Sequence, residues 1–169
     1  RIDRDTSGLL LVAKTDQAHL SLSEQIKAHS CDRVYQAVVY GRMKEPEGRV
    51  DAPIGRNPLE RKEMCVTAKN SKEAVTNYRV LQEYEGFSHL ELRLETGRTH
   101  QIRVHMAYLG HPVAGDPVYG PKKVIKSLEG QCLHAKSIAF DHPVTGERMR
   151  FDSELPTYFT DFLRTLRPL

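Results

Sequence analysis

The spacing of apolar residues along the chain predicts strands more often than helices. In the segment 87–95, Leu90, Leu92 and Leu94 alternate with more polar positions, as expected of a strand with one buried face. Further extended segments, rich in β-branched and aromatic residues, are predicted at 9–14, 33–40, 64–68, 74–82, 133–140 and 149–151, with at most a short strand near 49–54.

Helical spacing or helix-end signals occur in three places. The segment 16–28 has a partial apolar stripe of helical period and follows a candidate N-cap at Thr15 or Asp16. The segment 99–109 ends at a glycine, and 156–166 begins with a proline. Because strands outnumber helices and short turns join many of them, we expect an α+β fold with a mostly antiparallel mixed sheet, flanked by a few helices.

Length and composition narrow the class of protein. The 169 residues are 39% hydrophobic and 28% charged, typical of a soluble globular domain, so we treat 1–169 as one domain. No apolar run approaches the ~20 residues of a membrane span, which argues against a membrane protein. The three cysteines, Cys31, Cys65 and Cys132, lie far apart without a CxxC pair, which indicates neither a disulfide framework nor a cysteine-rich zinc site. A reducing cytoplasm is the simplest location.

The basic residues are compatible with a polyanionic partner. The net charge is only +3, but 25 Lys and Arg residues would suit a nucleic acid if they gathered on one face. The alternative is an ordinary solvated surface. Loop position makes five residues candidates for phosphate contacts: Arg61, Lys62, Arg98, Lys122 and Lys123.

The segment 94–120, LETGRTHQIRVHMAYLGHPVAGDPVYG, carries the densest set of chemical groups. If Thr99 starts a helix, His100 and Arg103 share one face, and Arg98 lies at the positive N-terminal end, which attracts anions. The alternative is that the apolar positions form core and the rest is surface.

Metal binding is not expected in this segment. Its histidines at positions 100, 105 and 111 do not stack on one helical face, and no acidic residue accompanies them. We therefore predict no metal site.

The N-terminal stretch RIDRDTSG places Asp3 between two arginines, either as part of a solvated end or as a working site. Ser7 has no visible partners for a catalytic triad, so Thr6, Ser7 and Gly8 are expected to shape a turn.

Four segments in order resemble the RluA-type pseudouridine synthases. RIDRDTSG resembles the HRLDxxTSG signature of that family, and RVYQAVVYG, from Arg33, resembles its second motif. TGRTHQIRVHMAYLGHPVAGDPVYG resembles the third motif, and CLHAKSIAFDHPVTGE, from Cys132, the closing LHA…HP.TGE element. Together they cover almost the whole chain. APIGRNP and AVTNYRVL are most similar to the RluD-like branch, which modifies large-subunit ribosomal RNA.

The resemblance implies a catalytic role for three residues. Asp3 takes the place of the catalytic aspartate, and Arg103 that of the arginine that pairs with it and orients it. The carboxylate can attack C1′, act as a base at C2′ or stabilise charge as the glycosidic bond breaks, and the sequence does not choose among these. Tyr35 matches the tyrosine that stacks on uracil and helps to remove the C5 proton.

Substrate contacts are expected from five further residues: Arg1, Arg98, His100, Leu133 and His134. By resemblance, Arg1 fills the hole left by the flipped nucleotide. Leu133 and His134 are expected to line or support the uracil pocket, and a position in the core is the alternative for Leu133. The partner is then RNA, by the finer similarity ribosomal RNA. The isomerisation has no net redox change and no energy input, so no cofactor is expected.

The sequence also departs from the family pattern. The usual histidine before the motif arginine is missing, as is the stretch that supplies early strands. We therefore expect the catalytic domain to lack its N-terminal part. Two other functions stay open: an RNA-binding fragment without turnover, and a glycosidase that uses Asp3 but releases the base.

Overall fold

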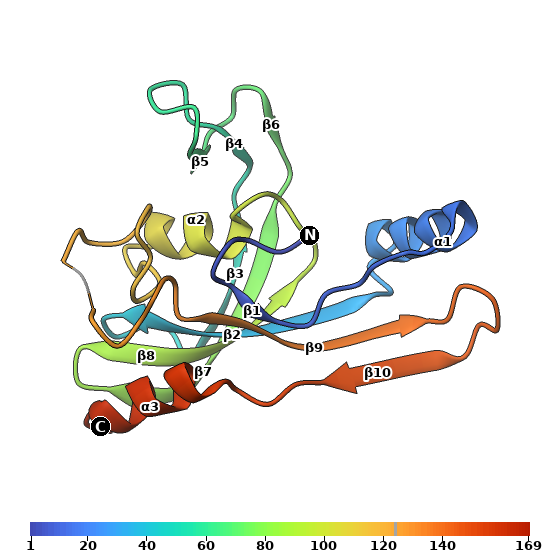
Figure 1. The fold of residues 1–169 in the computed structure, drawn as a ribbon. Helices are drawn as coiled ribbons and strands as arrows, with labels where there is room; N and C mark the ends of the chain where they lie inside the picture. The colour runs from blue at the N-terminus through green and yellow to red at the C-terminus, as the bar shows by residue number, and fades with distance from the viewer. Residues whose placement is uncertain (124) are drawn as a thin grey trace.

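A computed structural model, which describes residues 1–123 and 125–169, has a long twisted sheet as its centre (Figure 1). The strands of this sheet are β1 (Ser7–Gly8), β2 (Asp32–Tyr40), β3 (Glu47–Asp51), β7 (Val75–Tyr84), β8 (Phe87–Leu94), β9 (Leu133–Asp141) and β10 (Arg148–Asp152). They are arranged in the order β1-β9-β2-β8-β7-β3, and β10 also pairs with β9. Only the β1–β9 pair is parallel among the described strands, which confirms the predicted α+β fold with a mostly antiparallel sheet.

A second, small sheet stands apart from the first, at the top of Figure 1. It consists of β4 (Ile54–Arg56) between β5 (Met64–Val66) and β6 (Ser71–Lys72). Its Ile54 packs with Val104 of a helix on the main sheet, so the small sheet is anchored at its base.

The helices are α1 (Asp16–Lys27), α2 (Gln101–Tyr108) and α3 (Thr157–Thr165). Thr15 caps α1, because its hydroxyl accepts a hydrogen bond from the Ala18 N–H at 3.0 Å. The predicted helix at 99–109 begins two residues later, at Gln101, because His100 takes a left-handed conformation with φ of 57°. No residue of α1 is buried, so its apolar stripe does not form core. Among the described residues, no helix is both long and apolar enough to cross a membrane.

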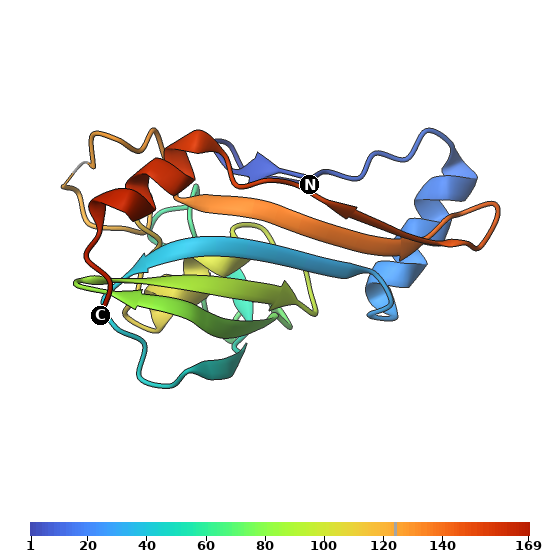
Figure 2. The same cartoon turned by 90° about the horizontal axis from the view of Figure 1, so that it is seen from below.

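The alternation of β2 divides the interior into two layers. Ala37 and Val39 point to the face covered by α2, whereas Val38 points to the opposite face, covered by Phe159 and Phe162 of α3. Figure 2 shows the sheet from the side of α3, with α2 partly hidden behind β2 and β8.

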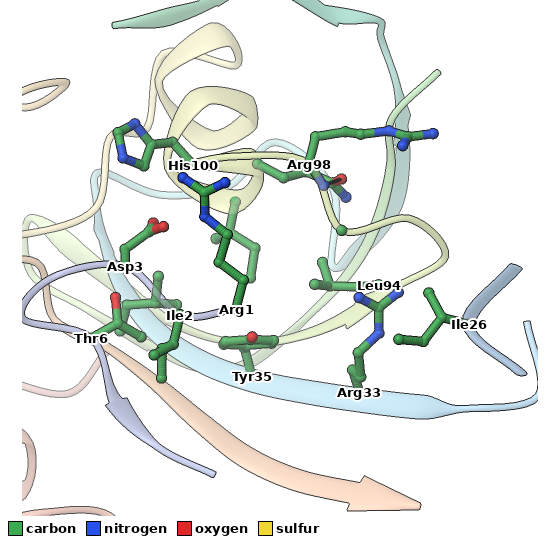
Figure 3. A pocket seen from close by; sticks show the side chains of 14 residues that line it. Arg1, Ile2, Asp3, Thr6, Ile26, Arg33, Tyr35, Leu94, Arg98 and His100 are labelled. Atoms are coloured by element: carbon green, nitrogen blue, oxygen red, sulfur yellow. Dashed lines mark hydrogen bonds between the residues drawn. The ribbon is translucent and has the colours of Figure 1, made fainter. Parts of the chain in front are cut away.

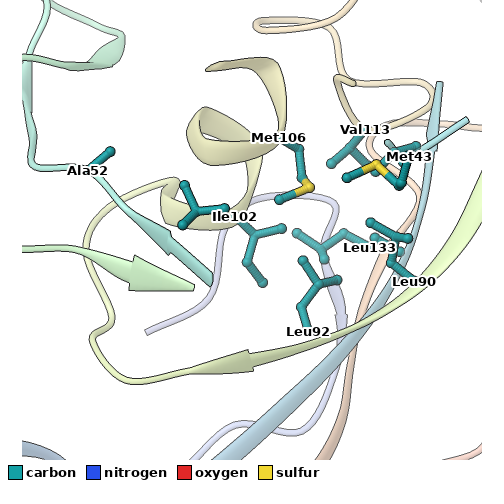
Figure 4. Packing of buried hydrophobic residues seen from close by; sticks show 11 residues of the cluster. Met43, Ala52, Leu90, Leu92, Ile102, Met106, Val113 and Leu133 are labelled. Carbon is teal, nitrogen blue, oxygen red and sulfur yellow. The ribbon is translucent and has the colours of Figure 1, made fainter. Parts of the chain in front are cut away.

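Figure 4 shows the α2 layer. Ile102 and Met106 of the helix pack on Leu90 and Leu92 of β8 and on Leu133 of β9. The helix that carries Arg103 is thereby fixed on the sheet.

The strand predicted at 9–14 does not form. Within the N-terminal segment 1–14, Ser7 and Gly8 alone pair with β9, opposite His134 and Ala135. From Ser137 onward, β10 occupies the same edge of β9. The chain after Gly8 therefore has no free edge to pair with. Its apolar run is partly exposed instead, with Val12 73% accessible.

Candidate active site

A tight turn holds Asp3. The Thr6 N–H donates to the Asp3 carbonyl oxygen at 3.1 Å, and Asp5 lies in the left-handed region with φ of 66°. Asp is one of the few non-glycine residue types that adopt this conformation readily. The Gln131 side chain, which precedes β9, donates to the Arg4 carbonyl at 2.6 Å and to the Thr6 hydroxyl at 2.9 Å. The turn is therefore held by its own backbone and by the sheet.

The two residues of β1 fasten this turn to β9. A side chain at Gly8 would overlap the backbone of Ala135, and its φ of 108° also requires glycine. The Ser7 hydroxyl lies between His134 Nδ1, at 2.8 Å, and the Tyr158 hydroxyl, at 2.7 Å. Ser7 is thus engaged in structural hydrogen bonds, as the sequence predicts for a turn-shaping residue.

Arg103 reaches two carboxylates from α2. Its Nη1 is 3.4 Å from Oδ2 of Asp3, the pairing suggested by the sequence. Its Nε and Nη2 donate to both carboxylate oxygens of Asp116, at 2.7 and 2.9 Å. Burial lowers the pKa of the guanidinium, but the two carboxylates, Asp116 first, outweigh this effect and raise it overall. Arg103 is therefore a permanent positive charge beside Asp3.

Sequence reasoning missed Asp116. Its side chain is fully buried, and Oδ1 also accepts hydrogen bonds from the N–H groups of Val118 and Tyr119, at 2.9 and 3.1 Å. One carboxylate thus sets both a local turn and the direction of Arg103. The only sequence signal was an acid enclosed by glycine and proline in GHPVAGDPVYG, a typical turn composition.

Tyr35 and Asp3 line one pocket of about 270 Å³ (Figure 3). Tyr35 rises from β2, with Leu133 of β9 and Ile102 of α2 also lining the cavity. Burial raises the pKa of the Tyr35 phenol; the positive charge of Arg33 opposes this in part, and the negative charge of Asp3 adds to the rise. The phenol is therefore protonated at neutral pH, and its ring forms an aromatic surface in the cavity.

His100 and Arg98 line the pocket from the segment before α2. His100 Nδ1 lies 2.7 Å from the Tyr119 hydroxyl. Burial lowers the His100 pKa, and the charge of Asp3 opposes this only in part. Arg98 donates through Nε to the Glu73 carbonyl at 2.7 Å, so its guanidinium is directed away from Asp3 and Tyr35 (Figure 3).

The remaining predicted contacts separate into two groups. Arg1 is exposed and stands above Tyr35 in the pocket, and Leu133 lines the pocket while 97% of its surface is buried in the core. The structure does not place His134 among the pocket-lining residues. Its Nδ1 faces Ser7, and its Nε2 is 2.8 Å from the Ser153 hydroxyl. His134 therefore supports the β1–β9 connection and does not face the cavity.

The other candidate phosphate contacts are exposed on two separate loops. Arg61 and Lys62 belong to the tip of the small sheet, and Lys122 and Lys123 to the loop that precedes β9. None of these four lines the pocket that holds Asp3.

The histidines of the 94–120 segment have structural partners. His105 is fully buried between the Thr76 hydroxyl and the Ala52 carbonyl, at 2.8 and 2.9 Å, and His111 Nδ1 faces the Tyr40 carbonyl. Within the described part of the chain, no group of three His, Cys, Asp or Glu side chains is placed to hold a metal ion.

The site combines a carboxylate, anchored by a buried arginine, with an aromatic ring in the same open pocket. This arrangement is typical of an enzyme active site. The sequence model of the family described as RNA pseudouridylate synthase matches residues 1–108. The chain belongs to this family.

Individual proteins agree with the assignment. The chain is 51% identical to the uncharacterized RNA pseudouridine synthase YlyB of Bacillus subtilis, over 99% of this chain and 54% of that protein. It is 44% identical to ribosomal large subunit pseudouridine synthase D of Pseudomonas aeruginosa, over 99% of this chain and 55% of that protein. The chain thus spans about half the length of these curated relatives.

A solved structure shows the same fold. Human RNA pseudouridylate synthase domain containing 1 superimposes with a TM-score of 0.82 and 31% identity, covering all of this chain and 72% of that one.

Proposed function

We propose that this protein isomerises uridine to pseudouridine in RNA, and that residues 1–169 form its catalytic domain. The observation that carries the proposal is the position of Asp3, held on the pocket wall by Arg103 with the ring of Tyr35 in the same cavity. Family membership supports the reaction class. The name of the Pseudomonas aeruginosa relative supports large-subunit ribosomal RNA as substrate and, with it, a cytoplasmic location.

The reaction needs a flipped nucleotide and one well-placed carboxylate. The uracil lies on the Tyr35 ring, because an aromatic face suits a base taken out of its stack. Asp3 then acts at the sugar, by attack on C1′, by proton removal at C2′ or by stabilising the charge that forms as the N1–C1′ bond breaks. The base turns while it is held, and a C5–C1′ bond replaces the N1–C1′ bond; C5 loses its proton to solvent and N1 takes one up.

Arg103 contributes by orientation. Two of its nitrogens are committed to Asp116, so the guanidinium cannot rotate away when Asp3 changes charge during the reaction. The third contact, Nη1 to Asp3, then presents one carboxylate oxygen in a constant direction. We assign Arg1 to the space vacated by the flipped base, and Leu133 to the apolar wall against uracil.

Tritium release tests the proposal. The full-length protein is incubated with ribosomal RNA that carries tritium at uridine C5, and the label appearing in water is measured. Isomerisation releases the label while the base stays in the RNA. Free uracil in the supernatant would instead show a glycosidase. RNA binding without label release, across large-subunit RNA and other RNAs, would show a binding protein and overturn the proposal.

A further inference from the structure

Arg33 carries a buried guanidinium nitrogen that nothing in the described part of the chain satisfies. Its Nε is the one buried side-chain polar atom there without a hydrogen-bond partner. A buried donor left unpaired carries the full cost of its desolvation, and more when it is charged, so native proteins rarely retain one without a use.

No carboxylate among residues 1–123 and 125–169 pairs with this guanidinium. Arg33 forms no salt bridge to any described residue, and the adjacent Asp32 is directed to Arg148, at 3.1 Å. Burial lowers the pKa of the Arg33 guanidinium. The titratable groups that act on it are Cys31 and Tyr35, and both are uncharged at neutral pH. An arginine nevertheless stays protonated in proteins. The site therefore holds a positive charge without a counter-charge.

The guanidinium lies at the edge of the proposed active site. Arg33 and Tyr35 are two residues apart on β2, and both point into the pocket (Figure 3). Gly97 allows the guanidinium to lie close to the backbone, since a side chain there would overlap Arg33 Nη1. Arg33 and Tyr35 also line an adjoining hollow of about 80 Å³, bordered by residues 9–11 and by β9. The two residues thus stand where the pocket opens into a second groove.

We propose that Arg33 binds a phosphodiester group of the RNA strand next to the uridine held over Tyr35. This inference rests on the proposed function and adds a defined anchoring residue to it. A guanidinium offers planar, paired donors that match phosphate oxygens, and a phosphate would supply both the missing acceptor and the missing negative charge. A nucleotide whose base occupies the pocket must leave its neighbouring phosphates at the pocket rim, where Arg33 lies.

The salt dependence of RNA binding tests this contact. Each phosphate contact on single-stranded nucleic acid contributes a slope of about −0.7 to the plot of log affinity against log salt. Arg33→Gln should weaken binding about tenfold at low salt and reduce the slope by about 0.7. Arg33→Lys keeps the charge and should retain most of the slope while losing the planar fit.

Arg93→Gln is a matched control. Arg93, on the neighbouring strand β8, lies directly opposite Val34. Because successive residues of a strand point to opposite faces, Val34 and Arg93 project from the face of the sheet opposite to that of Tyr35. Its side chain is 60% exposed, and its pairing with Glu91 is worth little to stability. Arg93→Gln removes one arginine charge, as Arg33→Gln does, but we expect it to leave the salt slope unchanged.

All variants are measured in the full-length protein by RNA titration at several salt concentrations, together with thermal unfolding and tritium release. An unchanged slope in Arg33→Gln would overturn the inference. A loss of stability with that unchanged slope would show a purely structural residue, and a loss of preference for uridine over cytidine would show a base contact. If the wild-type protein releases tritium, such a result leaves the proposed function intact. A wild-type protein without RNA affinity would defeat both.

Discussion

Arg103 and Asp116 form a two-point, fully buried ion pair, with Nε and Nη2 of the arginine 2.7 and 2.9 Å from the two carboxylate oxygens. The contact to Asp3 is longer, at 3.4 Å, and uses the remaining terminal nitrogen. The arginine is thus anchored by one acid and oriented toward the other. Asp116 lies 13 positions after Arg103, on a turn that its own side chain stabilises.

Asp116→Asn should destabilise the protein and impair turnover together. The amide cannot balance the Arg103 charge, and breaking a buried ion pair costs about 3–5 kcal/mol of unfolding free energy. Urea unfolding measures this loss. Asp152→Asn is the control, because Asp152 pairs with Lys136 at 2.7 Å with 62% of its side chain exposed, and such a pair is worth about 0–1 kcal/mol. Equal losses in the two variants would contradict the anchoring role.

Asp3→Asn should abolish turnover while the protein stays folded. Arg103 keeps Asp116 as its main partner, so the unfolding free energy changes little, but the amide cannot act as an anionic nucleophile or base. We expect tritium release to fall by at least about 100-fold, with RNA affinity nearly unchanged. Asp5→Asn, in the same turn, is the control, since asparagine also accepts its φ of 66°. Retention of about a tenth of the rate in Asp3→Asn would contradict the catalytic assignment.

Two substitutions of Tyr35 separate stacking from proton transfer. Tyr35→Phe keeps the ring, so RNA affinity should be retained while tritium release falls about 100-fold, if the hydroxyl helps to remove the C5 proton. Tyr35→Leu also removes the stacking, which is worth about 1–3 kcal/mol per base, so affinity should fall as well. Tyr78→Phe is the control for the loss of a tyrosine hydroxyl. Tyr78 is a half-buried residue of β7 that does not line the pocket. Full activity in Tyr35→Phe would restrict Tyr35 to stacking.

Stability should decrease on mild acidification because of His89. Burial against Phe159 lowers the His89 pKa to about 4, whereas the unfolded chain has an imidazole pKa of about 6.5. Between these values the unfolded state binds more protons, so the stabilisation present above pH 6.5 is lost as the pH falls toward 4.

From pH 7 to 5, His89 alone should remove about 2 kcal/mol of unfolding free energy. His89→Gln should flatten this dependence, measured by urea unfolding at several pH values. The dependence should not vanish, because burial also lowers the pKa of His100, His105 and His134. A variant with the same pH profile as the wild-type protein would show that His89 does not titrate as we infer.

Local sequence signals predicted most of the fold. The alternation of leucines at 90, 92 and 94 predicted β8, and Thr15, one of the two candidate caps, precedes the start of α1. The cap succeeds because it depends on near neighbours, and the alternation succeeds because the period of a strand is the same whichever element covers its buried face. The strand expected at 9–14 failed for the opposite reason. An apolar run indicates that a segment can pair, but β10 already occupies the edge of β9 that it would need.

For the site, the sequence by itself determined which residue types stand in the ordered motifs, and so identified Asp3, Tyr35 and Arg103 as candidates. Only the tertiary structure decided their neighbours. It places Asp116 against Arg103 and His134 against Ser7, and it leaves Arg33 without a counter-charge from the described residues. The physical reason is that hydrogen bonds and ion pairs depend on distances of a few ångströms between residues from separate elements. Periodicity reports which face of an element is buried, whereas sheet order and helix docking determine what that face meets.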